Sequence, residues 1–196
     1  MTTAILLAAG DLPWPLIIGG LAVAAVVLGI VLYNQLVAQA VRVDNAWSDI
    51  DVQLKRRHDL IPNVVEAVKG YAGYEKGTLE AVIAARSRAM SAQGPKEAAA
   101  AENALSGTLK SLFALAEAYP QLKASEQFSH LQQQLASIED ALQSSRRYFN
   151  ATVRELNTTV RMFPWNLLAG VAGARPRDFF EIGDDAERAV PRVKLD

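Results

Sequence analysis

The most apolar part of the chain lies near its beginning, where no charged side chain occurs between Asp11 and Arg42. Its centre, residues 16–32, consists of Leu, Ile, Val, Ala and Gly. A bilayer core about 30 Å thick needs roughly 20 apolar helical residues, and this run with its flanks supplies them. Trp14 and Tyr33 bracket the run, where such side chains favour the lipid headgroups. The pattern predicts a transmembrane helix over residues 14–36, preceded by a short N-terminal tail, residues 1–13.

A different pattern follows the apolar run, because apolar side chains now return every three or four residues, which is typical of a helix in a bundle. These positions are Ala40, Val43, Trp47, Ile50, Leu54, Ile61, Val64 and Val68. Neither Pro nor Gly occurs between Ile30 and Ile61, so we expect the membrane helix to continue directly into this helix. Pro62 lacks a backbone N–H, and it predicts a kink or a local restart of the helix between about His58 and Pro62.

Three further helical stretches are predicted, over about residues 78–90, 96–119 and 125–163. Ser125 is the expected N-cap of the last one, and Pro164 is expected to end it after a long apolar stripe that includes Phe163. Short loops between long helices favour antiparallel neighbours. The fold class predicted is all-α: one N-terminal transmembrane helix that continues into an elongated antiparallel, up-and-down helical bundle with coiled-coil character, residues 37–163. A partly ordered tail, residues 164–196, follows, in which Phe179 and Phe180 should not both be left in water.

The charges divide the chain in two, because all 20 Lys and Arg lie at or after Arg42, and so do all the acidic residues except Asp11. The domain after the apolar run is therefore balanced in charge, which argues against nucleic acid as a partner. The N-terminal tail lacks the Lys or Arg that a cleaved signal peptide carries before its apolar part, so we expect the apolar run to be kept as an anchor, with a cleaved signal as the alternative. Basic residues follow the span and none precedes it, so the positive-inside rule predicts an N-terminus outside and a bundle in the cytoplasm.

Few residues offer catalytic or metal-binding chemistry. The chain has no Cys and only two His, and His58 and His130 are not at ligand spacing from each other. Both histidines are interpreted as surface residues. No nucleophile–base set and no phosphate-binding Gly loop is present. We therefore expect no catalytic residue, no cofactor and no metal ion, and hence a protein that is not an enzyme.

The helix after the span carries an unusually dense polar run, which we interpret as a candidate interaction ridge for protein docking or self-assembly. Its members are Trp47, Asp51, Lys55, Arg56, Arg57, Asp59 and Glu66. Asp51 and Lys55 have the spacing of a favourable helical ion pair. The alternative interpretation of such a run of charges is an ordinary solvent-exposed face of the helix. Arg57 occupies a position where the stripe calls for Ile or Leu, so it needs a partner, and Glu139 and Asp140 are candidates. A ligand-binding role for Arg57 is the alternative.

The last predicted helix carries a second candidate set, whose members repeat at seven-residue intervals. Arg147, Arg154 and Arg161 share one helical edge, and Asn150 and Asn157 share another. The arginines could face anionic headgroups or an acidic neighbouring helix, or form a solvated edge. A buried Asn in a bundle fixes register at some cost in stability. This set is therefore interpreted as register-fixing or lipid-facing.

Several motifs together resemble the LemA family of bacterial membrane proteins, over about residues 33–181. They are the stretch from Val43 to Ala72 with Asp51-Val52-Gln53-Leu54-Lys55-Arg56-Arg57 at its centre, then Ala116-Glu117-Ala118-Tyr119-Pro120, Arg147-Tyr148-Phe149-Asn150, Phe163-Pro164-Trp165-Asn166 and Phe179-Phe180-Glu181. The resemblance implies a single-pass helical bundle anchored in the bacterial inner membrane with its N-terminus outside. It implies no established catalytic activity. Magnetosome relatives, and relatives encoded beside membrane proteases, imply a scaffold or membrane-organising role.

Three functions are expected from these observations. The first is a membrane-anchored, non-enzymatic scaffold that organises membrane or partner proteins, with the lipid bilayer and further copies of itself as partners. The small residues Gly20, Ala24, Ala25 and Gly29 would permit close helix packing in the span. The second is a regulatory accessory subunit of a membrane quality-control protease or another membrane enzyme. The third is an unrecognised enzyme or small-ligand receptor that uses Arg57 and nearby carboxylates.

Overall fold

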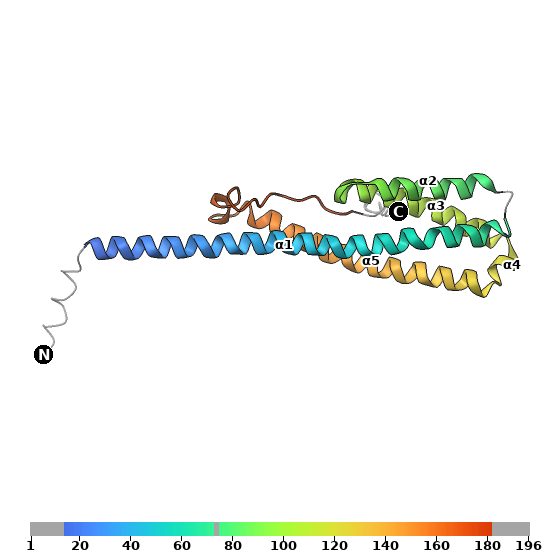
Figure 1. Ribbon diagram of the computed structural model, residues 1–196, viewed down its shortest axis with the longest axis horizontal. Helices are drawn as coiled ribbons and strands as arrows, with labels where there is room; N and C mark the ends of the chain where they lie inside the picture. The colour runs from blue at the N-terminus through green and yellow to red at the C-terminus, as the bar shows by residue number, and fades with distance from the viewer. Residues whose placement is uncertain (1–13, 73–74, 182–196) are drawn as a thin grey trace, which may run out of the picture. The chain divides into compact units, whose positions relative to one another are not determined.

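The computed structural model describes residues 14–72 and 75–181, and these residues form helices without any strand. The helices are α1 (Trp14–Lys69), α2 (Lys76–Ser91), α3 (Gly94–Glu117), the short α4 (Pro120–Lys123) and α5 (Glu126–Thr159), followed by one 3₁₀ turn, η1 (Trp165–Leu167) (Figure 1). The predicted all-α fold, with a long apolar N-terminal helix that continues into a bundle, is confirmed. The predicted tail 1–13 and the last part of the predicted C-terminal tail, 182–196, lie outside the described residues.

Helix α1 joins the apolar run and the first bundle helix without a break over 56 residues. The alternative of a local restart near Pro62 is wrong, since the helix continues through Pro62 to Lys69. Within the described residues, α1 alone is long and apolar enough to cross a membrane, as judged by length and composition. Only 6% of its apolar window is buried. In the described part of the chain this run is therefore left uncovered, unlike the core helix of a soluble protein, which is mostly buried.

The chain forms two compact units, each assembled from segments far apart in the sequence. The first unit comprises the described residues 14–42 together with 155–176, and the second unit comprises 43–154 together with 177–181. In the first unit, Arg42 Nη1 lies 3.5 Å from Glu155 Oε2, and Gln39 Nε2 donates a hydrogen bond to Glu155 Oε1 at 3.4 Å. Both contacts tie α1 to the end of α5 within that unit.

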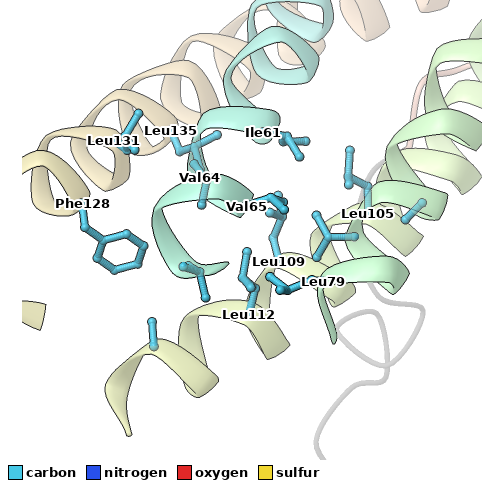
Figure 2. Close-up of a cluster of buried hydrophobic side chains, with 14 of the residues drawn as sticks. Ile61, Val64, Val65, Leu79, Leu105, Leu109, Leu112, Phe128, Leu131 and Leu135 are labelled. Carbon is cyan, nitrogen blue, oxygen red and sulfur yellow. The ribbon is translucent and has the colours of Figure 1, made fainter. Parts of the chain in front are cut away.

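The core of the second unit is built from apolar side chains of α1, α2, α3 and α5 that point toward one another (Figure 2). The α1 stripe contributes Ile61, Val64 and Val68, all fully buried, as the three-four spacing predicts. The facing positions include Leu79 and Val82 of α2, Leu105, Leu109 and Leu112 of α3, and Phe128, Leu131 and Leu135 of α5. Burial of these stripes against one another holds the bundle together, since it removes their apolar area from water.

Helix α5 begins where the sequence predicts and ends earlier. Ser125 Oγ accepts a hydrogen bond from the Phe128 backbone N–H at 3.4 Å, so the predicted N-cap is confirmed. The helix ends at Thr159, and the next turns are tighter, with the Arg161 N–H donating to the Thr158 carbonyl. Pro164 disfavours the α conformation only at Phe163, the residue directly before it, so it does not account for the four residues lost from the predicted helix. The expectation that Phe163 belongs to the buried stripe is wrong, because its side chain is 76% exposed.

The chain after Pro176 returns to the second unit and docks through Phe180. Phe180 is fully buried, with its ring 5.5 Å from that of Trp47, which in turn lies 5.3 Å from the ring of Phe149. The Asn150 amide bonds to the Phe180 backbone in both directions, each at 2.9 Å. Burial of Phe180 agrees with the prediction that the Phe pair is not left in water. The Asn150 bonds anchor this segment to α5, a role that the seven-residue spacing did not suggest.

Candidate functional site

The second unit buries a polar cluster where α1 faces α3. Arg57 and Glu102 are only 4% and 1% exposed, and His58 is buried beside them. Arg57 Nη1 donates a hydrogen bond to Glu102 Oε2 at 2.9 Å, and Arg57 Nη2 donates to Ser106 Oγ at 2.8 Å. The other carboxylate oxygen, Glu102 Oε1, lies 2.6 Å from His58 Nε2. One carboxylate thus has two basic side chains as partners, which satisfies both of its oxygens in a dry environment.

The positions of these residues on their helices explain the cluster. Arg57 occupies the position between Leu54 and Ile61 where the apolar stripe of α1 calls for an apolar side chain. Glu102 occupies a position on the apolar stripe of α3, between Ala98 and Leu105. Arg57 Nη1 also lies 3.6 Å from Glu139 Oε2 on α5, so the predicted pairing with Glu139 is confirmed. Sequence reasoning missed the closer partner Glu102, although an acidic residue on the Ala-rich stripe of α3 was the available signal. The interpretation of His58 as a surface residue is wrong, because it faces Glu102 inside the bundle.

A second polar contact compensates for Pro62. In an α-helix the carbonyl of His58 would accept a hydrogen bond from the N–H four residues later, and that residue is Pro62, which has none. Arg86 of α2 supplies the missing donor, with its Nε 2.7 Å from the His58 carbonyl oxygen. The proline therefore creates an acceptor inside the bundle, and Arg86 uses that acceptor to tie α2 to α1.

Two grooves reach this cluster from different helices. One, of about 360 Å³, lies among α1, α3 and α5 and is lined by Arg57, Ser106, Leu109, Lys110, Phe113, Gln132, Leu135, Ala136 and Glu139. The other, of about 350 Å³, lies beside α1 and α2 and is lined by Trp47, Asp51, Leu54, Lys55, His58, Asp59, Ala89, Met90, Ala92 and Ala98. Asp51 is exposed at the edge of the second groove, and partial burial there raises the pKa of its carboxyl above its ordinary value.

The chemistry of the cluster is that of a structural cross-link. A guanidinium remains protonated at physiological pH, and both terminal nitrogens of Arg57 already bond to protein groups. This occupancy favours an ion pair that fixes the register of α1, α3 and α5 over a free ligand-binding arginine. Within residues 14–72 and 75–181, no group of three or more His, Asp or Glu side chains is placed to hold a metal ion.

The residues of the predicted interaction ridge lie in different environments in the structure. Trp47, Asp51, Lys55 and Asp59 follow one another at four-residue steps and line the second groove together. Arg56 lies beside a separate shallow hollow of about 450 Å³ that Asp59, Leu60, Gln134, Ser137 and Ile138 also line. Arg57 is inside the bundle, and exposed Glu66 lies 3.7 Å from Lys69. Asp51 and Lys55 are both described, and no ion pair joins them at the expected spacing.

The second predicted set also occupies several environments. Exposed Arg147 donates a hydrogen bond to Ser144 Oγ at 3.2 Å, and Asn150 holds the Phe180 backbone. Arg154 is exposed and Asn157 half-buried on the last turns of α5. Arg161 is exposed and lies past the end of that helix. The seven-residue spacing therefore does not continue as one helical edge through Arg161.

Known proteins similar to this chain place it in a family. The model of the LemA family matches residues 46–195. Protein LemA of Metamycoplasma hominis is 24% identical over 167 residues, covering 83% of this chain and 73% of that protein. The magnetosome protein MamQ of Magnetospirillum gryphiswaldense is 23% identical over 174 residues, covering 76% of this chain. The aligned part spans 64% of the length of that magnetosome protein.

The family match includes the α1 segment after Ala46, the Arg57–Glu102 cluster and the docked Phe180, and it spans well over half of the sequence. These are the elements that build the second unit. The chain therefore belongs to the LemA family.

Proposed function

We propose that this protein is a membrane-anchored, non-enzymatic scaffold whose bundle organises membrane or partner proteins through self-assembly. The observation that carries the proposal is the continuity of α1, in which an uncovered apolar run and a buried bundle helix belong to one element. In a helix of this kind no loop separates the proposed anchor from the first helix of the bundle. The relatives named as magnetosome proteins support a role in organising membranes.

The exposed side chains of α1 support the membrane anchor. Large apolar residues from Leu16 to Val31 are mostly solvent-exposed in the isolated chain, among them Ile18, Leu21 and Val26. An apolar surface of this length is unfavourable in water and is typical of a bilayer contact. With basic residues only on the bundle side, the orientation that follows is a single-pass inner-membrane protein with its N-terminus outside and its bundle in the cytoplasm.

The groove lined by Trp47, Asp51, Lys55 and Asp59 supports a docking role for the α1 ridge. Lys55, Arg56 and Asp59 are exposed, and within the described residues their side chains make no ion pair. Charges of both signs beside an aromatic side chain suit a specific protein contact, since charge patterns select the partner and aromatic residues anchor it. Further copies of this chain are the partner that the proposal names.

Cross-linking in native membranes, followed by size measurement in lipid nanodiscs, tests the proposal. The triple variant Lys55→Glu, Arg56→Glu, Asp59→Lys is expected to reduce the assembly to smaller species. The matched control reverses two cations and one anion on the exposed side of α2, with Lys76→Glu, Arg88→Glu and Glu80→Lys, and should leave the assembly size unchanged. An unchanged assembly in the first variant contradicts the docking role of the ridge.

The accessory-subunit alternative predicts a different outcome of the same experiment. A monomer that cross-links to one other membrane protein, such as a quality-control protease, would replace the scaffold by that alternative. The anchor is tested separately by extraction of membranes with alkaline carbonate. Full-length protein is expected to stay in the pellet, and its recovery in the wash would end both proposals.

A further inference from the structure

The part of the first unit that follows α5 carries an uncovered apolar surface that the scaffold role does not use. Phe163, Leu167 and Val171 are 76%, 68% and 76% exposed, and Met162 is also exposed. Leu167 and Val171 lie four residues apart on turns closed by hydrogen bonds from Ala169 to Trp165 and from Ala172 to Leu168. Several large apolar side chains in one short segment exceed the scattered exposure of an ordinary surface.

A hydrogen bond fixes where this segment meets α1. Trp165 Nε1 donates to Gln35 Oε1 at 3.0 Å, which brings residues 161–173 beside α1 (Figure 1). Burial along α1 begins at the same place, since residues 14–31 are exposed or half-buried whereas Leu32 and Leu36 are buried. The residue that bonds Trp165 therefore lies within one turn of the place where burial along α1 begins.

The position of Gln35 along α1 gives the depth of the segment. About 20 residues at 1.5 Å each cross the hydrocarbon core, so a span that begins near Trp14 ends near Tyr33. Gln35 follows by two residues and lies at headgroup level. An indole that keeps one polar bond while its ring stays apolar is well suited to that level.

The charges of the first unit match a bilayer surface. Its described residues include three basic side chains, Arg42, Arg161 and Arg175, and one acidic side chain, Glu155. Arg42 pairs with Glu155, which leaves a net positive charge from Arg161 and Arg175 at the two ends of the apolar segment. Arginines on either side of an apolar surface are attracted to anionic lipid headgroups.

From these observations we propose that residues 161–175 form a second, interfacial membrane contact, in which Phe163, Leu167 and Val171 enter the headgroup region beside the end of the span. The partner is the surface of an anionic bilayer. The inference depends on the proposed membrane anchor, because the depth of the segment is measured along α1. As a consequence, both segments of the first unit contact the membrane, residues 14–42 through the span and residues 155–176 through this surface. The contact between α1 and the end of α5 is then held close to the bilayer.

The absence of cysteine from the chain permits a direct test with single-cysteine variants of the full protein. Leu167→Cys and Val171→Cys report on the segment, Val26→Cys reports on the span, and Ile83→Cys is a matched exposed apolar position on α2. Each variant carries a fluorophore in phosphatidylcholine–phosphatidylglycerol vesicles. Quenching is measured with aqueous iodide and with lipids that bear a nitroxide near the top of the acyl chain.

Labels at Leu167 and Val171 are expected to be quenched by the nitroxide lipid and to show iodide quenching severalfold below that at Ile83. If they behave like the label at Ile83 while Val26 is shielded from iodide, the interfacial contact is overturned and the anchor stands. If Val26 is accessible to iodide, the anchor itself fails. Shielding of Leu167 and Val171 from both quenchers would assign the surface to another protein, such as a second copy of this chain, and would also overturn the proposal.

Discussion

Among single residues, Glu102 is expected to contribute strongly to stability through its buried ion pair. Replacing it by Ala removes the acceptor for Arg57 and His58 and leaves a buried guanidinium whose remaining carboxylate, Glu139, is 3.6 Å away. We expect Glu102→Ala to lower the free energy of unfolding by about 3 kcal/mol, since loss of one partner of a buried ion pair typically costs 3–5 kcal/mol. Urea unfolding of the full chain in detergent, followed by circular dichroism, measures the change.

The double variant Arg57→Met, Glu102→Leu is the control for that prediction. It removes both charges and keeps the volume, so it should be less destabilising than Glu102→Ala alone. Equal or greater loss in the double variant would show that the cluster stabilises the bundle by more than charge compensation.

The cluster also shows what the sequence can and cannot specify at this scale. An arginine on an apolar stripe identifies Arg57 as a buried side chain with a carboxylate partner, and Glu139 is one such partner. The closest partner, Glu102, lies on a helix whose stripe is made mostly of Ala and Leu. Which of several acidic residues comes nearest depends on the rotation and offset of α3 against α1, and those follow from packing rather than from spacing along either helix.

Asp51 provides a test that depends on pH. Burial raises the pKa of its carboxyl above the ordinary 3.8, so the folded state binds the proton more tightly than the unfolded state. At a pH above the raised pKa, the carboxyl is charged in both states, and its charge makes the folded state less stable. We expect Asp51→Asn to raise the unfolding midpoint at neutral pH, and the difference from the natural sequence to vanish as the pH falls below 3.8.

Unfolding midpoints of both proteins over a series of pH values measure this dependence. Asp49→Asn, an exposed carboxylate on α1 outside the groove, controls for the general loss of one negative charge. A lower midpoint for Asp51→Asn at neutral pH would contradict the sign of the effect.

At the scale of secondary-structure elements, helix α1 continues through Pro62, and Arg86 of α2 provides the hydrogen-bond donor that the proline lacks. Arg86→Ala should leave the His58 carbonyl unsatisfied and lower the free energy of unfolding by about 1–3 kcal/mol. In a Pro62→Ala background the N–H of residue 62 can bond to that carbonyl, so the same substitution should cost less. A double-mutant cycle by urea unfolding measures the coupling, and equal costs in both backgrounds would refute the compensation.

The two ends of α5 differ in how well the sequence predicts them, because one depends on neighbouring residues and the other on tertiary packing. Ser125 caps α5 as its residue type indicates, because capping depends on neighbours within one turn. The early end of α5 at Thr159 was not predicted, since Phe163 continues the apolar spacing of the helix. In the structure Phe163 is exposed, and the apolar spacing there corresponds to a surface of the first unit rather than to the bundle core. An apolar residue alone does not distinguish a protein core from a bilayer contact.

For the whole molecule, α1 is a single helix whose two parts suit different surroundings. Its exposed apolar residues suit lipid, and its stripe from Val43 onward suits a protein core. The transition occurs around Arg42, where the first basic side chain of the sequence lies. For the proposed anchor, the positive-inside rule predicts from the distribution of basic residues on which side of the membrane the bundle lies.

Labelling of intact cells with a membrane-impermeant maleimide tests this orientation, and the absence of native cysteine makes the signal specific. Thr3→Cys is expected to react in intact spheroplasts, because the proposed orientation has the N-terminus outside. Gln133→Cys, at an exposed position of α5, should react only after the membrane is permeabilised. The positive-inside rule gives this result since no Lys or Arg precedes the span whereas all 20 follow it. The reverse labelling pattern would place the bundle outside the cell and exclude cytoplasmic partners for the ridge on α1.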